Sequence, residues 1–253
     1  MDTTRRSLER HLAGHGLRVR GGWIPTPADG LPALPGGCAP AVVWLVGQVG
    51  SEVWPVFSAS SCAQDGLPDP MDRWSKSIGD GLACVLGGRA LYPSEGPPWH
   101  PFQQWASRSE PVQTSALMLQ IHPQHGLWHA YRFALLLPVL APADAATLSA
   151  PHAPVADLCA ACDGQPCLRA CPVGAFTGSS LRTDTCTAHL RGPQGAECMQ
   201  GGCLSRRACP IGAGDRYAPE HAAFHMAAYF GARRSGEAAE PARTTEVPNG
   251  GRT

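Results

Sequence analysis

Cys159-Ala-Ala-Cys162-Asp-Gly-Gln-Pro-Cys167-Leu-Arg-Ala-Cys171-Pro172 is the first of two similar cysteine runs in this chain of 253 residues. The second run is Cys198-Met-Gln-Gly-Gly-Cys203-Leu-Ser-Arg-Arg-Ala-Cys209-Pro210, and a single Cys186 lies between the two. Eight of the eleven cysteines therefore fall between residues 159 and 209. Each run ends in Cys-Pro and continues into a short apolar segment, so the stretch is an internal pseudo-repeat built around thiolate chemistry.

Two iron–sulfur clusters are the first interpretation of this pattern. A [4Fe–4S] cluster needs four thiolates around a cube, and in the bacterial two-cluster arrangement the cysteine before proline ligates the other cluster. Here the gaps before Cys167 and Cys209 are longer than in the bacterial run, and Gly164, Gly201 and Gly202 can provide the bends of the longer loops. The crossover rule assigns the ligands of cluster 1 as Cys159, Cys162, Cys167 and Cys209, and those of cluster 2 as Cys171, Cys186, Cys198 and Cys203.

Two structural zinc sites are the main alternative, because eight thiolates can also form two Cys₄ sites. Zinc sites usually pair cysteines at both ends of the motif and have no need of two Cys-Pro endings. A disulfide framework is disfavoured, since clustered cysteines in a reducing compartment more often bind metal. The other three cysteines, Cys38, Cys62 and Cys84, are expected to be buried free thiols, with Cys84 on the apolar face of a helix.

The overall charge is balanced, with 20 basic and 20 acidic residues, and 43% of the residues are hydrophobic. A balanced charge gives no field that would attract nucleic acid or an anionic membrane. No run reaches the roughly 18 apolar residues of a membrane span, and the charged N-terminus lacks the apolar core of a secretory signal. We therefore expect no nucleic acid partner, no membrane association and a cytoplasmic location.

Patterns in the first 110 residues predict two strands and three helical segments. The apolar run at residues 41–46 predicts a buried strand, and residues 22–24 a second short one. Helical periodicity predicts helices within residues 5–19 and at residues 71–86, and one or two helical turns at residues 102–109. Asp69, just before Pro70, is the expected N-cap of the helix at 71–86.

The rest of the chain predicts a hairpin, the cysteine module and a final helix. Residues 114–121 and 127–139 are the expected hairpin strands, joined by the turn His122-Pro-Gln-His-Gly126. Repeated Ala and Pro predict a linker at residues 141–154. Proline at the start of residues 219–230 favours a helix there, and the polar, aperiodic residues 231–253 predict a disordered tail.

The module of residues 155–213 resembles the C-terminal half of epoxyqueuosine reductases and the related reductive dehalogenases. Those chains show a cysteine run ending in Cys-Pro, an isolated cysteine matched here by Cys186, and a second Cys-Pro run. The crossed ligand assignment is also their pattern. The hairpin at residues 119–138 is similar to the His-Pro…Gly…Trp…Arg hairpin of cobalamin-processing chaperones of the CblC type.

In both families, the domain with this hairpin is a nitroreductase-like α+β fold that holds cobalamin or, in some relatives, a flavin. The resemblance therefore implies the α+β class, with an antiparallel-sheet domain at residues 1–145. A small ferredoxin-like module, mostly helix and loop, is expected at 155–215, followed by a C-terminal helix at 216–230 and the tail at 231–253.

The resemblance to the chaperones places His122 against a corrin or flavin, whereas the plainer interpretation is a turn histidine that hydrogen-bonds the hairpin. Epoxyqueuosine reductases carry a proton-donating acid ahead of the hairpin, and Glu95 is the only acid at the comparable place here. Arg206 and Arg207, between two cysteines of the second run, are expected to raise a cluster potential, to dock an acidic electron donor or to form a solvated face.

Two clusters held close together form an electron conduit. We expect an electron-transfer protein that receives electrons from a redox protein partner and delivers them to a cobalamin or a substrate in the N-terminal domain. The alternatives are a ferredoxin-type carrier without a catalytic site of its own and a zinc-stabilised binding protein.

Overall fold

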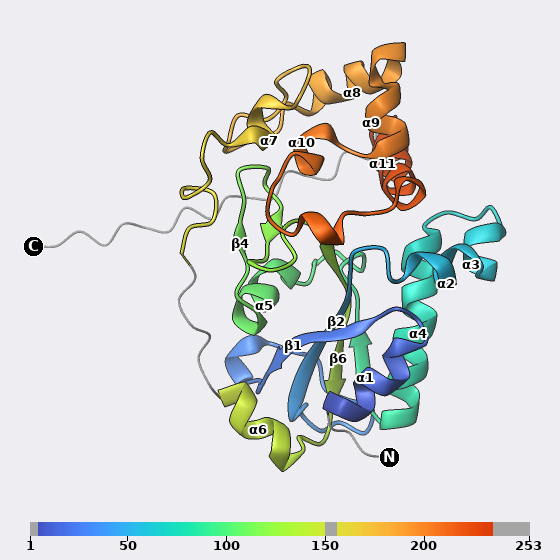
Figure 1. Ribbon diagram of the computed structural model, residues 1–253. Coiled ribbons are helices and arrows are strands. Elements are labelled where there is room, and N and C mark those ends of the chain that lie inside the picture. Colours follow the sequence, from blue (N-terminus) through green and yellow to red (C-terminus); the bar gives the residue numbers. More distant parts are fainter. Residues whose placement is uncertain (1–4, 150–155, 235–253) are drawn as a thin grey trace, which may run out of the picture.

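The computed structural model describes residues 5–149 and 156–234, and its centre is a four-stranded antiparallel sheet (Figure 1). The sheet has the order β1-β2-β6-β3. Its strands are β1 (Arg18–Trp23), β2 (Val42–Val49), β6 (His129–Leu137) and β3 (Arg89–Leu91). Helices surround this sheet, so the predicted α+β class is correct.

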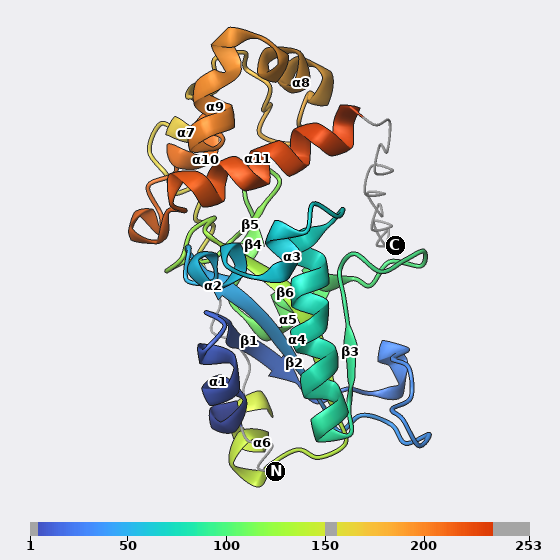
Figure 2. The ribbon, with the colours of Figure 1, turned by 90° about the vertical axis from the view of Figure 1, so that its right-hand side faces the viewer.

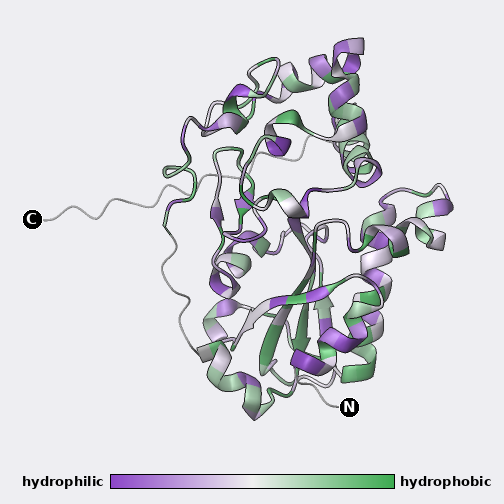
Figure 3. Cartoon of the chain, in the orientation of Figure 1, coloured by the Kyte–Doolittle hydropathy of each residue, from purple (hydrophilic) through white to green (hydrophobic). Residues whose placement is uncertain are grey.

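The central strand β2 is buried along its whole length, as its continuous apolar sequence predicts. Because strand side chains alternate between faces, Trp44 joins one core and Leu45 the other. Neighbouring β6 follows the same rule, with Leu135 in the first core and Leu136 in the second. Both strands are strongly hydrophobic in Figure 3, and both faces of the sheet are therefore covered.

Two helices cover the first face of the sheet and one covers the second. The first face packs against α1 (Arg5–Ala13) and α4 (Pro70–Leu86), and the second against α5 (Phe102–Ser109). The three predicted helices are therefore confirmed.

Pro70 begins α4 and Gly87, in the left-handed conformation, ends it. Asp69 precedes α4 with a positive φ and makes no side-chain cap, so the predicted capping role is wrong.

The predicted hairpin pairs differently from the expectation. The short strands β4 (Gln113–Thr114) and β5 (Gln120–Ile121) pair with each other, whereas β6 pairs with β2 and β3. The physical reason is burial: residues 133–137 of β6 have no exposed surface in the centre of the large sheet. The exposed Met118 and Leu119 form the tip of the small β4–β5 sheet instead.

Short helices make up the remaining segments. The first domain also has α2 (Trp54–Ser58), α3 (Ser61–Gln64) and α6 (Pro142–Ser149), so most of the expected linker is helical. The cysteine module contains α7 (Pro166–Arg169), α8 (Thr183–Arg191), α9 (Ala196–Gly201) and α10 (Leu204–Arg207). Single 3₁₀ turns occur at Pro27–Asp29, Pro193–Gly195 and Ala213–Asp215.

The last helix, α11 (Pro219–Arg234), lies between the cysteine module and the sheet domain (Figure 2). It starts at the predicted proline and continues four residues beyond Phe230, so residues 231–234 are helical rather than part of a tail. The rest of the expected tail, residues 235–253, lies outside the described residues. No helix within the described residues has both the length and the apolar character that a membrane span requires.

Two glycines show how closely the module docks on the sheet domain. Gly126, in the turn before β6, and Gly212, after the second Cys-Pro, both have positive φ. A Cβ on Gly126 would lie 1.9 Å from the carbonyl oxygen of Ile211, and one on Gly212 would lie 2.2 Å from the carbonyl carbon of His125. Only glycine therefore permits this backbone-to-backbone contact.

Candidate metal centre

The eight clustered cysteines form two groups of four thiols, and within each group the thiols interact electrostatically. The first group, here called group 1, consists of Cys159, Cys162, Cys167 and Cys209. The second, group 2, consists of Cys171, Cys186, Cys198 and Cys203. The structure therefore brings together the same sets of four that the crossover rule assigns.

Burial and mutual proximity act together on these thiols. Burial raises the pKa of Cys167, and the neighbouring thiol of Cys209 raises it further. Burial likewise raises the pKa of Cys186, with smaller contributions from Cys203 and other thiols of group 2. Neighbouring buried thiols are difficult to deprotonate together, and a bound metal ion stabilises their thiolate forms. Each group of four can therefore act as one set of metal ligands.

Backbone N–H groups point at the sulfurs. The amide of Ala175 donates to the Cys171 sulfur at 3.2 Å, and the amide of Ile211 does the same for Cys209. Both bonds arise in the Cys-Pro-x-Gly segments of the pseudo-repeat, where Gly174 and Gly212 adopt positive φ. The donor is the fourth residue after Cys171 but the second residue after Cys209, so the two segments aim amides at sulfur from different positions. Amide donors to sulfur are one means by which proteins tune iron–sulfur clusters.

The last cysteine of each run lies in the group of the other run. Cys171 ends the first run and joins group 2, whereas Cys209 ends the second run and joins group 1. Helices α7 and α10, which precede these two cysteines, pack against each other. That packing brings the end of each run beside the other.

A single metal ion and a cluster impose different spacings on their thiolate ligands. A tetrahedral zinc ion needs four sulfurs at about 2.3 Å from one point. Among residues 5–149 and 156–234, no three His, Cys, Asp or Glu side chains gather closely enough for one ion. In a cube each thiolate binds a different iron, so the sulfurs stand further apart than around one ion.

The other three cysteines are free thiols, as expected, but none of them is fully buried. Cys38 and Cys84 are exposed and Cys62 is partly buried. The placement of Cys84 on the apolar face of α4 is therefore wrong, because that face is occupied by residues such as Met71 and Trp74. No disulfide joins the described cysteines.

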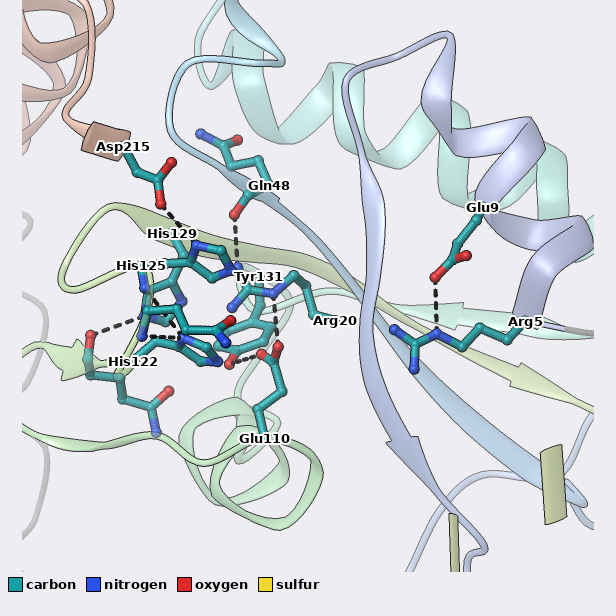
Figure 4. A network of polar contacts seen from close by, with 12 residues as sticks. Arg5, Glu9, Arg20, Gln48, Glu110, His122, His125, His129, Tyr131 and Asp215 are labelled. Carbon is teal, nitrogen blue, oxygen red and sulfur yellow. Dashed lines mark hydrogen bonds and ion pairs between the residues drawn. The ribbon is translucent and has the colours of Figure 1, made fainter. Parts of the chain in front are cut away.

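His122 is buried in the turn before β6 (Figure 4). Its Nδ1 accepts hydrogen bonds from the amides of Gln124, at 3.1 Å, and His125, at 3.3 Å. Burial, together with the positive charge of Arg20, lowers the pKa of His122 to about 4, so the ring is neutral and can accept. The ring closes the turn, and its predicted contact with a corrin or flavin stays a prediction.

A cavity of about 350 Å³ lies between β6, the β4–β5 tip and the α10–α11 region, and we call it the junction cavity. His129 lines this cavity whereas His122 does not. Its aromatic and charged lining consists of His129, Tyr131, Arg132, Arg206, Tyr217 and His225.

Arg206 is partly buried at this junction and its contacts are within the protein, so the expected solvated face is wrong for it. Its expected role in docking an electron donor stays a prediction. Its guanidinium lies 4.7 Å from the ring centre of Trp128 and 4.5 Å from that of Tyr217, and it donates to the carbonyl of Leu127. Arg207 instead pairs with Glu197 on the surface, at 3.2 Å. Arg206 thereby ties the second cysteine run to the sheet domain.

Glu110, at the end of α5, is bonded to Tyr131 of the cavity lining (Figure 4). It accepts hydrogen bonds from Tyr131 Oη at 2.6 Å and from Arg20 Nε at 3.0 Å. Glu95, the acid suggested by the resemblance, pairs with Lys76 at the surface instead. Sequence reasoning missed Glu110, because it stands in no motif and reaches Tyr131 only through the fold.

A polar stripe on α11 connects the sheet domain with group 2. His221 and His225 are four residues apart and their Nε2 atoms are 3.0 Å apart. One turn further on, the Tyr229 hydroxyl interacts with the Cys186 thiol. The spacing of four residues between His221, His225 and Tyr229 was the available sequence signal, and it places the three side chains on one face of a helix.

No protein-family model matches the chain, and no curated protein matches it. Similar solved structures include epoxyqueuosine reductase from Bacillus subtilis, at 16% identity and a TM-score of 0.43, over 88% of this chain and 63% of that one. Epoxyqueuosine reductase with an epoxyqueuosine-modified tRNA-Tyr stem loop matches at 16% identity and a TM-score of 0.40, over 72% of this chain and 54% of that one.

A selenomethionine-labelled epoxyqueuosine reductase matches at 15% identity and a TM-score of 0.39, over 72% of this chain and 52% of that one. The chain therefore spans about half to two thirds of the length of these structures. The tRNA stem loop was bound to that epoxyqueuosine reductase and is a property of that protein alone. Our expectation that this chain has no nucleic acid partner stays a prediction. These three similar solved structures are all epoxyqueuosine reductases.

Proposed function

We propose that this protein carries electrons through two [4Fe–4S] clusters to an acceptor in the junction cavity. In this proposal group 1 and group 2 each hold one cluster, and a redox protein partner supplies the electrons. When bound, such a cluster supplies a one-electron carrier whose potential the protein tunes. The observation that supports the proposal most directly is the division of eight thiols into two crossed groups of four.

The surroundings of the thiols fit this cofactor. Amide donors reach sulfurs in both groups, including Cys171 and Cys209, and hydrogen bonds of this kind raise the reduction potential of a cluster. Apolar side chains such as Ile121 and Leu127 pack around the buried Cys209, which limits water near group 1. Hydrogen bonds to sulfur and the exclusion of water are both means by which a protein sets the reduction potential of an electron carrier.

The junction cavity is a suitable place for an acceptor, because both halves of the protein line it. Tyr131 and Arg132 come from the sheet domain, whereas Arg206 lies three residues from both Cys203 and Cys209. On the other side of the cavity, His225 belongs to the stripe that ends at Cys186. An acceptor there would contact residues that pack beside the thiols of both groups.

The size of the cavity bears on which acceptor it holds. A volume of about 350 Å³ is at the lower end of the range for drug-sized ligands. A small substrate or the ring system of a flavin fits that volume, whereas an entire cobalamin would leave most of its surface outside. We therefore propose no step through cobalamin, and we favour a small substrate or a flavin over cobalamin as the electron acceptor.

Metal analysis of the anaerobically purified protein tests the proposal. About eight irons and as much acid-labile sulfide per chain are expected, since each of two clusters holds four irons. Zinc in place of iron would contradict the proposal and support the zinc-stabilised alternative. A Cys84→Ala variant, which changes an exposed thiol outside both groups, should keep the full iron content.

Spectroscopic titration separates an acceptor site from a simple carrier. Flavin and cobalamin both absorb visible light, and binding in a protein cavity shifts their spectra. If only the flavin spectrum shifts, the result agrees with the cavity volume. If the cobalamin spectrum shifts, our preference for a flavin or substrate over cobalamin as the acceptor is wrong. With eight irons present and no response to either compound, the remaining possibilities are the ferredoxin-type carrier and an acceptor that does not absorb visible light.

A further inference from the structure

The junction cavity carries a positive charge that no acid in its lining balances. Arg132 enters it from β6 and Arg206 from α10. Of the described residues that line the cavity, none is Asp or Glu. Neither arginine takes part in an ion pair with any carboxylate of residues 5–149 or 156–234.

Both guanidinium groups also retain donors that have no acceptor. Arg132 donates from Nε to Gln48 Oε1 at 2.9 Å, but its Nη2 is buried without a partner. Arg206 donates from Nη2 to the Leu127 carbonyl, but its Nε is buried without a partner. A buried donor without an acceptor is costly, and a charged one more so. Two such donors from separate elements at one cavity indicate a place for an external acceptor group.

Neighbouring groups respond to this positive field. Burial lowers the pKa of His225 to about 2, and the charges of Arg132 and Arg206 contribute to the shift. Burial also lowers the pKa of His129 to about 3, with Arg20 as the largest charged contributor. The two histidines are therefore neutral and add no competing charge of either sign. Only the arginines remain charged at the cavity.

Asp72 is the carboxylate that interacts with Arg132 over a longer distance. It lines a separate cavity of about 450 Å³, on the side of Arg132 towards α4, and forms no ion pair with that arginine. Burial raises the pKa of Asp72. Asp72 thus leaves the junction side of Arg132 uncompensated.

We propose that the junction cavity binds a small molecule through a carboxylate or phosphate group held by Arg132 and Arg206. Planar guanidinium groups match such oxyanions in shape and charge. The rings of Tyr131 and Tyr217 and the side chain of Leu127 provide the apolar contact for the remainder of the molecule. As a statement about the electron acceptor this inference rests on the proposed function, but the binding itself does not require iron.

Calorimetric titration of the intact protein with fumarate, with its neutral diamide and with inorganic phosphate tests the inference. Fumarate and fumaramide share one rigid shape, so a difference in their affinity reports charge. Fumarate or phosphate should bind with a dissociation constant in the millimolar range or tighter, and fumaramide at least about tenfold more weakly. Binding of phosphate alone would identify a phosphate group as the recognised anion, and binding of fumarate alone a carboxylate.

Arginine variants connect the binding to the cavity. Arg132→Gln should weaken anion binding at least about tenfold, and Arg132→Lys, which keeps the charge, should restore part of it. Arg108→Gln is the matched control, because it removes one positive charge that pairs with Asp29 far from the cavity. Near-ultraviolet circular dichroism identifies any variant that fails to fold.

Two kinds of result would overturn the inference. One is wild-type protein that binds neither anion at millimolar concentration or binds fumaramide as well as fumarate. The other is an Arg108→Gln variant that loses as much affinity as Arg132→Gln. Iron content is measured on the same samples. Anion binding without iron would refute the electron-transfer function alone, whereas full iron content without anion binding would refute this inference alone.

Discussion

At the scale of single residues, Tyr229 has a role that its sequence context does not reveal. Its hydroxyl is buried and makes no hydrogen bond of ordinary geometry, yet it interacts with the Cys186 thiol. An O–H group next to a ligand sulfur stabilises the reduced, more negative cluster and so raises its potential. In the proposed function, Tyr229 therefore tunes the group 2 cluster and is not one of its ligands.

Tyr229→Phe should lower the potential of the group 2 cluster by about 20–60 mV, the equivalent of one hydrogen bond in a one-electron couple. A redox titration followed by electron paramagnetic resonance measures this shift. Tyr92→Phe, in the sheet domain where the hydroxyl bonds Asp80, is the matched control and should leave both potentials unchanged. Equal potentials in the Tyr229→Phe variant and the wild type would refute the tuning role.

Gly126 is a second residue whose importance depends on its surroundings. Gly126→Ala should reduce the free energy of unfolding by about 2 kcal/mol or more, because left-handed backbone is costly for alanine and the new Cβ meets Ile211. Denaturant unfolding measures the change. Gly214→Ala introduces a Cβ with no heavy atom within 4 Å, so its effect should stay within about 0.5 kcal/mol. Similar losses in both variants would contradict the close contact.

At the scale of elements, the crossed runs make a distinctive prediction about Cys209. Cys209→Ala removes a residue of the second run, yet it should damage the cluster of the first run, because Cys209 lies in group 1. About four irons should remain, with the signal of the group 2 cluster intact. Iron analysis and electron paramagnetic resonance measure the outcome.

The reciprocal change is Cys171→Ala, which should remove the group 2 cluster and leave group 1 loaded. If each variant instead lost the cluster of its own run, the crossed assignment would be wrong. The two variants differ only in which Cys-Pro segment is changed, so each serves as the control for the other.

The elements show where sequence reasoning succeeded and where it could not. Continuous hydrophobicity predicted β2, and helical periodicity predicted α4, because these patterns are local consequences of burial. The pairing of β6 was missed, since residues 114–121 and 127–139 both have strand character and a turn lies between them. The strand with which β6 pairs is decided by burial in the complete sheet, and a local sequence pattern carries no information about that burial.

The candidate site divides in the same way. Cysteines have few structural uses in such spacing, so the residues proposed here to bind metal could be named from the sequence. Arg132 and His225 could not, because each is an ordinary residue on a strand or helix until the fold places it in the lining of the junction cavity. Glu110 could not either, because only the fold brings it to Tyr131. The stack of Tyr217 on His221, with ring centres 4.1 Å apart, is another contact created by the docking of α11.

At the scale of the whole molecule, buried histidines make stability depend on pH. Burial is the largest cause that lowers the pKa of His129 and His221 to about 3 and that of His225 to about 2. The unfolded chain binds protons at these sites near pH 6.5, whereas the folded protein does not. Stability is therefore fully present above pH 6.5 and is lost as the pH falls towards the folded values.

Denaturant unfolding at a series of pH values measures this dependence. Each of these histidines should contribute about 1 kcal/mol of lost stability per pH unit below pH 6. His225→Gln should flatten the slope by about one proton, whereas substitution of the exposed His11 by Gln should leave it unchanged. A wild-type curve that stays level between pH 7 and pH 5 would contradict the prediction.

The crossed groups also govern how the module can be inherited. Group 2, from Cys171 to Cys203, lies entirely inside the segment from Cys159 to Cys209 that group 1 encloses. A recombination breakpoint between the two runs would leave both descendants with two incomplete sets of thiols. Because neither run alone holds a complete set of four thiols, we expect the segment from Cys159 to Cys209 to be inherited only as a single unit.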